Sequence, residues 1–226
     1  MSKCELCIVR EMSSLKTLTK DEITTLASCR TSQTIKKGEI LFDEGDAVNG
    51  IYCIKDGICK MTKLSSNGKD QIVKLVKRGE ILGQRSLISE EPANLSAVAL
   101  EDMNVCFVPK NEVMTFINSN PQFAVSLMKT ISHDLKEADD QMVSLAQKSV
   151  RERLADTLLH LEASFDVDNE NCINVHLTRE ELAGMIGTAT ESCIRLLSEF
   201  KKEGLIDLIG KKIEIKDKNK LKRIAN

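Results

Sequence analysis

Glu191 and Arg195 are the two residues of this sequence whose types and spacing most directly suggest chemistry. They are four positions apart, so on a helix they lie on one face. An arginine donates two hydrogen bonds to O6 and N7 of guanine, and a glutamate accepts one from N4 of cytosine. The pair is suited to reading base edges, while an exposed surface ion pair is the simpler interpretation. The two interpretations are compatible, because an ion pair with Glu191 can orient Arg195 before DNA is bound.

The elements that must position this pair read as two helices joined by a tight turn. Thr178 and Glu181 form a capping-box pattern, which predicts a first helix from Arg179 to Ile186. Gly187 can adopt the left-handed conformation that ends it. The inward residues of the two helices are expected to be Leu182, Ala183 and Ile186, then Cys193, Leu196, Leu197 and Phe200. The outward residues at and along the second helix are expected to be Thr188, Thr190, Glu191, Ser192, Arg195 and Lys202. This is the layout of a helix-turn-helix, whose second helix enters the major groove of DNA.

A β-hairpin is expected directly after the second helix. Gly204 ends that helix, and residues 205–216 alternate apolar and polar around Gly210-Lys211, as in the wing of a winged helix. Lys211 at its tip is the candidate phosphate contact. The whole chain has a net charge of −2, but residues 192–226 hold ten Lys and Arg against five Asp and Glu. This local excess fits a surface that faces phosphate, and equally a solvated charged end.

A heptad pattern precedes this region. Its apolar positions are spaced 3, 4, 3, 4 and 3 apart, with polar residues between them: Met128, Ile131, Leu135, Ala138, Met142 and Leu145. Such a narrow seam is typical of a coiled coil, and a symmetric homodimer is the usual way to form one. The alternative is a single amphipathic helix that packs on its own domain.

The first half of the chain has a different periodicity. Short apolar pieces separated by Gly, Asp and Asn predict strands at 39–42, 50–54, 58–64, 71–76, 96–100 and 105–108. Strands of this length and spacing favour an antiparallel barrel or roll. The length of 226 residues suits two small domains, and 42% hydrophobic with 29% charged residues is typical of a globular chain. No apolar run is long enough for a membrane span and no secretory leader is apparent, so we expect a cytoplasmic protein with no membrane partner.

Eight cysteines are present, and in the cytosol we expect them to be reduced. Only Cys4 and Cys7 form a C-x-x-C pair, and no second pair stands at zinc-ribbon spacing. An enzyme is not indicated. The three histidines stand apart from any nucleophile or paired carboxylates, and the chain has no glycine-rich phosphate loop. His133, on the expected coiled-coil helix, is interpreted as a solvated polar residue.

The order of these regions resembles the bacterial Crp/Fnr family of transcription regulators. The likeness runs from about Cys4 to Ile215 and includes the stretches Lys37–Asp46 and Tyr52–Gly57, which are similar to the cyclic-nucleotide-binding β-roll signature. It implies an α+β fold: an antiparallel β-roll at residues 1–118, a long dimerisation helix at 119–147 and a winged helix-turn-helix at 148–226. It also implies a homodimer that binds two half-sites of double-stranded DNA and works with RNA polymerase. Glu191 and Arg195 stand where the family places its base-reading residues.

The effector domain departs from the family pattern. Nucleotide-binding members hold the ribose with Gly-Glu and the cyclic phosphate with Arg-Ser. In this sequence the ribose-binding pair is similar to Gly83-Gln84. Leu95-Ser96 occupies the place of the phosphate-binding pair. Arg85-Ser86 lies nearby, but at a different spacing. A buried phosphate without its guanidinium loses a charge partner. The resemblance therefore implies an effector pocket of these six residues that does not bind cyclic AMP.

The iron–sulfur branch of the family uses N-terminal cysteines and one cysteine in the roll. Three cysteines are similar to these ligands: Cys4, Cys7 and Cys106. The fourth ligand position falls near Ser13, and Cys29 lies at a different spacing. A cubane cluster usually needs four thiolates, so no cofactor is predicted. The alternative function is an iron–sulfur or thiol redox sensor that uses these cysteines.

Overall fold

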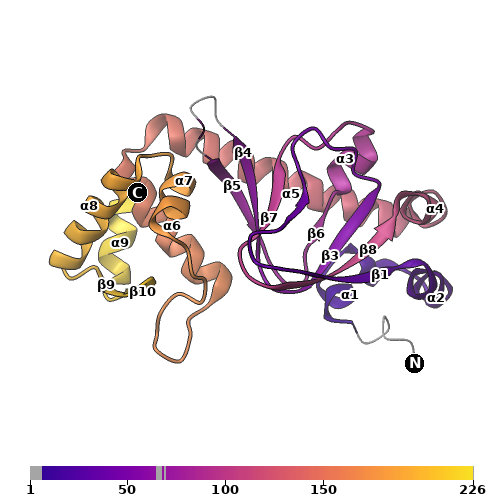
Figure 1. Ribbon diagram of the computed structural model, residues 1–226, viewed down its shortest axis with the longest axis horizontal. Helices are drawn as coiled ribbons and strands as arrows, with labels where there is room; N and C mark the ends of the chain where they lie inside the picture. The colour runs from indigo at the N-terminus through magenta and orange to yellow at the C-terminus, as the bar shows by residue number, and fades with distance from the viewer. Residues whose placement is uncertain (1–6, 65–67, 69, 226) are drawn as a thin grey trace. The chain divides into compact units, whose positions relative to one another are not determined.

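The computed structural model describes residues 7–64, 68 and 70–225. It divides into two compact units, which Figure 1 shows with their elements labelled. Unit 1 consists of Met1–Lys63 and Ile72–Glu137, and unit 2 of Leu64–Gln71 and Ala138–Asn226. Cys4 lies outside the described residues. No helix in the described part of the chain is both long enough and apolar enough to cross a membrane.

Unit 1 contains two four-stranded sheets with antiparallel pairings, in the orders β1-β8-β3-β6 and β2-β7-β4-β5. The strands are β1 (Thr31–Ile35), β2 (Ile40–Phe42), β3 (Gly50–Asp56), β4 (Cys59–Leu64), β5 (Asp70–Val76), β6 (Ile81–Leu82), β7 (Ser96–Ala99) and β8 (Met103–Pro109). The six strands expected from the sequence are present, and β1 and β6 are additional. The antiparallel roll is confirmed.

The alternation of side chains along β3 and β8 explains why the roll has two cores. Successive residues of a strand point to opposite faces. Ile54 and Val105 therefore join the cluster of Phe42, Cys59 and other residues of the second sheet. Cys53 and Cys106, which are register partners, point to the other face and join a second cluster.

Helices cover that other face. Buried residues of α1, α2 and α4, and of the start of the long helix α5, complete the second cluster. The helical elements before α5 are α1 (Ile8–Met12), the 3-10 turn η1 (Ser14–Thr17), α2 (Lys20–Cys29), α3 (Gln84–Ser89) and α4 (Lys110–Ser119). None of them was expected from the sequence. The clearest missed indication is the capping box of Thr19 and Glu22 at the start of α2.

Helix α5 (Pro121–Gln147) is the predicted long helix. It begins where the Asn120 side chain accepts a hydrogen bond from the Phe123 amide at 3.0 Å, with proline in the first helical position. Its buried residues, Phe123 and Leu127, lie only near the start. Beyond them the large apolar side chains of α5 are partly or largely exposed.

From Val150 onwards, unit 2 is helical apart from one hairpin and one isolated bridge. Its elements are α6 (Val150–Phe165), α7 (Arg179–Ile186), α8 (Thr190–Lys202), β9 (Ile206–Ile209), β10 (Lys212–Ile215) and α9 (Lys218–Ala225). Helix α6 buries Leu154, Leu158 and Leu161. Residues 172–177 form only an isolated bridge, at Ile173. Helix α9 was not expected, because half of its eight residues are charged.

Candidate nucleic-acid interface

The turn between α7 and α8 has the predicted local structure. Thr178 accepts a hydrogen bond from the Glu181 amide, and Glu181 accepts one from the Thr178 amide, which completes the capping box. Gly187 ends α7 with φ of 62° and ψ of 53°, a left-handed conformation that favours glycine. The Thr188 amide then donates to the Ala183 carbonyl at 3.1 Å. These bonds fix the path of the chain into α8.

Arg153 of α6 also fixes this turn. Its guanidinium donates to the carbonyls of Lys148 at 2.7 Å, Ile186 at 2.7 Å and Gly187 at 3.3 Å. One side chain thus satisfies carbonyls at the end of α7 and just before α6, which would otherwise need other partners. No local pattern around Arg153 indicates this role, because Ile186 and Gly187 are more than 30 positions away along the chain.

Helix α8 has a buried apolar face and an exposed polar face, as predicted. The buried residues are Cys193, Leu196, Leu197 and Phe200, and burial raises the pKa of the Cys193 thiol to about 11. On the other face Glu191 and Arg195 are exposed, and the Arg195 side chain is 74% exposed. Thr188, Thr190 and Ser192 are half-buried at and near the start of the helix.

The expected ion pair between Glu191 and Arg195 is not formed. Arg195 Nε instead lies 3.9 Å from Glu199 Oε1, one turn further along α8. Glu191 has no ion-pair partner among the described residues. It lies in the first turn of α8, where the helix dipole stabilises a carboxylate without a cation. The Glu191 carboxylate is thus available to an incoming donor, and Arg195 can give up its long, exposed contact with Glu199.

The C-terminal half of α8 is held against α6 by Arg151. Its Nη2 atom donates to both carboxylate oxygens of Glu203, at 2.8 and 2.7 Å. The guanidinium carbon also lies 4.7 Å from the centre of the Phe200 ring, within the range of a cation–π contact. This double contact fixes the orientation of α8 on the domain.

Strands β9 and β10 form the predicted wing, with Ile209 opposite Lys212 and Gly210-Lys211 at the tip. The two adjacent lysines differ. Lys212 Nζ lies 2.7 Å from both Asp168 and Glu170, and these hydrogen-bonded carboxylates raise the pKa of its ammonium group. Lys211 is exposed and has no such partner in the described part of the chain. The Lys211 ammonium group at the tip is therefore available to a phosphate.

The six predicted effector residues lie at two places in the roll. Gly83 precedes α3 with φ of 90°, and Gln84 and Ser86 of α3 are buried. Arg85 points to solvent and pairs with Glu91 at 2.7 Å. Across the roll, Leu95 and Ser96 are half-buried, and Ser96 Oγ accepts a hydrogen bond from the Glu44 amide at 2.9 Å. Arg85 and Ser96 are thus already engaged within the protein.

A cavity of about 370 Å³ opens in the roll beside this region. Its walls are formed by Leu41, Phe42, Asp46, Ala47, Val48, Asn49, Tyr52 and Phe107. The six predicted effector residues, all of which the structure describes, lie outside these walls. The charged residue in the walls is Asp46.

The described cysteine candidates are Cys7, Cys29 and Cys106, and all three pack on the second cluster of unit 1. Cys29 Sγ donates to the Leu26 carbonyl at 3.5 Å, and Cys106 Sγ lies 3.2 Å from Arg30 Nη1. Two of these thiols are thus engaged with the protein. A cubane cluster needs four thiolate ligands, and the described part of the chain presents no assembled set of that kind.

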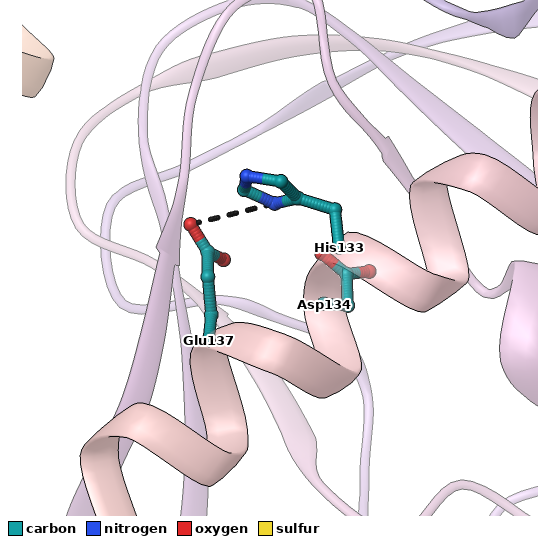
Figure 2. A group of neighbouring side chains, drawn as sticks. All are labelled: His133, Asp134 and Glu137. Atoms are coloured by element: carbon teal, nitrogen blue, oxygen red, sulfur yellow. Dashed lines mark ion pairs between the residues drawn. The ribbon is translucent and has the colours of Figure 1, made fainter.

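Figure 2 shows three other potential ligands, His133, Asp134 and Glu137, on one side of α5. His133 Nδ1 lies 3.6 Å from Glu137 Oε1. Lys74 forms ion pairs with both Asp134 and Glu137. Burial opposes the charge of Lys74, but the Asp134 hydrogen bond and nearby carboxylates outweigh it and raise the pKa. The cluster thus already holds a cation, and it is an ion-pair network with His133 in solvent, as expected.

Comparisons with known proteins agree with this architecture. The cyclic nucleotide-binding domain family matches residues 32–120, and the Crp-like helix-turn-helix domain family matches residues 152–224. The transcriptional activator protein Anr of Pseudomonas protegens is 30% identical over 84% of this chain and 79% of its own length. The anaerobic regulatory protein of Bacillus subtilis is 31% identical over 81% and 78%. The structure of FixK2 from Bradyrhizobium japonicum has a TM-score of 0.79 and 23% identity over 87% and 98%.

The fold and the exposed face of α8 define a DNA-binding regulator of transcription with a winged helix-turn-helix. With relatives of this identity and coverage, the chain belongs to the Crp/Fnr family of transcription regulators.

Proposed function

We propose that α8 reads base edges in the major groove through Arg195 and Glu191, with Thr188, Thr190 and Ser192 at its N-terminal end. The supporting observation is the exposure of Arg195, together with the absence of an ion-pair partner for Glu191 within the described chain. Residues near the start of a recognition helix are the ones that reach base edges. Arg195 reads a guanine and Glu191 a cytosine, while Lys211 contacts a phosphate from the wing tip.

We also propose that the protein acts as a homodimer through α5. The seam residues Met128, Leu135 and Met142 are 56%, 62% and 63% exposed in the single chain, and Leu145 and Ala138 are exposed as well. Apolar side chains at heptad positions lose this exposure when they pack against a twin helix. The remaining member of the seam, Ile131, is half-buried.

A twofold dimer presents two copies of α8 to DNA. Its operator is then a palindrome whose half-sites are about one helical turn apart, near 34 Å. The test is selection of bound duplexes from a random pool, followed by titrations in which one half-site is scrambled. We expect a palindromic sequence and a loss of at least about 100-fold on scrambling. The dimer would be contradicted by a selected sequence that has no palindromic symmetry and that binds equally well when only one half-site is present.

The roll is proposed to be the effector domain, with α5 as the connection to the DNA-binding unit. Within unit 2, the last seam residue, Leu145, lies against the turn of the helix-turn-helix: a Cβ atom at Gly187 would be 2.9 Å from Leu145 Cδ2. The seam residue Leu145 therefore lies in direct contact with the turn that orients α8. RNA polymerase is the proposed partner in transcription. Operator selection repeated with a panel of metabolites tests for the effector.

The second candidate input is redox state, sensed through Cys4, Cys7 and Cys106. The relative from Bacillus subtilis is named an anaerobic regulatory protein, and Cys7 and Cys106 pack on one cluster. The absorbance spectrum of protein purified without oxygen distinguishes an iron–sulfur sensor from a regulator without a cluster. A visible iron–sulfur band would support the cluster. A colourless sample whose operator binding is the same with and without thiol reductant would exclude both redox forms.

A further inference from the structure

Ile194 is an apolar side chain on the exposed face of α8. It is 47% exposed, whereas the other large apolar residues of this helix, Leu196, Leu197 and Phe200, are buried. It lies within α8, and its carbonyl accepts a hydrogen bond from Ser198 Oγ at 2.9 Å. The position needs no apolar residue for the fold, because the core face of α8 is complete without it.

Helix geometry places Ile194 among the proposed base readers. Each residue turns the helix by about 100°. Seen down the axis, Ile194 and Arg195 therefore lie on either side of Glu191, at about 60° and 40° from it. Ile194 is also one turn beyond Thr190, within the half of α8 that begins at its N-terminus. A groove that contacts Glu191 and Arg195 also receives Ile194.

We propose that Ile194 packs on the C5-methyl group of a thymine and so adds an apolar element to base recognition. In the major groove, this methyl is the apolar feature that distinguishes thymine from the other bases, and apolar side chains contact it. Glu191 and Arg195 recognise hydrogen-bond donors and acceptors on the bases, while Ile194 makes an apolar contact beside them. The inference rests on the proposed function, because it requires α8 in the major groove.

The size of the effect follows from the burial of a single methyl group, which changes an equilibrium by a factor of about four. A symmetric dimer buries one such methyl in each half-site. Removal of both methyl groups is thus expected to weaken binding by about 15-fold.

Deoxyuridine substitution is the direct test, because it removes only the methyl group and keeps base pairing and O4. Full-length protein is titrated against the selected operator, in which each symmetry-related pair of thymines is replaced in turn by deoxyuridine. For the wild type, we expect one pair whose replacement weakens binding by about 15-fold. For Ile194→Ala, the unmodified operator binds more weakly by a similar factor, and the same replacement changes nothing further.

The matched control is Val167→Ala, which truncates a side chain of similar exposure, 43%, outside α8. It should respond to deoxyuridine as the wild type does. If no thymine pair affects the wild type, or if Ile194→Ala keeps the full deoxyuridine effect, the inference is wrong. Both outcomes leave the proposed function intact as long as Arg195→Ala still relaxes discrimination at a G·C pair. If Arg195→Ala has no such effect, the proposed function itself fails.

Discussion

Helix α8 and the roll of unit 1 differ in whether their polar side chains are exposed or are buried and paired within the protein. In α8 the polar residues face solvent, and Glu191 has no ion-pair partner within the described chain. In the roll, the corresponding ligand-binding places hold Gln84, which is buried, and Arg85 and Ser96, which are engaged within the protein. The face of α8 is thus available to a charged partner, whereas two of the predicted effector residues, Arg85 and Ser96, are already paired within the protein.

The two regions place different demands on their side chains. A reading surface needs side chains that project from a helix whose opposite face is buried. A ligand pocket needs a complete set of buried partners. The resemblance implies that Leu95 stands where nucleotide-binding members hold an arginine, and without that guanidinium a buried phosphate would lack its charge partner.

The largest expected effect is the loss of the proposed dimer. Leu135→Asp with Met142→Asp places charges on the α5 seam, where each would face its counterpart in the twin helix. We expect a monomer in sedimentation at micromolar concentration and a loss of operator binding of at least about 1000-fold.

Val143→Asp is the control for the dimer prediction. Val143 is 49% exposed on the same helix, but it lies outside the heptad seam. This variant should sediment as a dimer and bind normally. A wild type that sediments as a monomer at micromolar concentration would refute the coiled-coil interpretation.

A smaller effect is expected from Arg153, which positions the turn before α8. Arg153→Met keeps most of the side-chain length but removes its three hydrogen bonds to main-chain carbonyls. We expect the free energy of unfolding to fall by about 2 to 3 kcal/mol, measured by urea denaturation. Arg223→Met on α9 is the comparison, since Arg223 has no ion-pair partner among the described residues. Equal stability of the two variants would show that the Arg153 bonds are replaced by water.

Much of unit 2 was predictable because its signals are local. The capping box at Thr178 and the glycine at 187 bracket α7, and the 3.6-residue period of α8 separates its two faces. Strand β1 and helix α3 gave no such signal, because β1 is mostly polar and exposed and α3 is only six residues long. The Arg153 contacts join segments that are distant in sequence, so only the folded chain reveals them.

The smallest effect is expected for cyclic AMP, which should not bind. Leu95 offers no hydrogen bond to a cyclic phosphate, and Arg85 is paired with Glu91. Calorimetry at physiological nucleotide concentrations should show no binding heat, and operator affinity should not change. A micromolar dissociation constant for cyclic AMP would overturn this prediction.

Titration of two variants at two salt concentrations separates sequence reading by α8 from backbone contact by the wing. Arg195→Ala should bind the selected operator about 10- to 100-fold more weakly and should lose discrimination at one base pair per half-site. Lys211→Ala should weaken binding to matched and single-mismatch duplexes alike and reduce the salt slope by about 1 for each phosphate that is no longer neutralised. If Arg195→Ala binds every duplex as the wild type does, α8 does not read the DNA sequence.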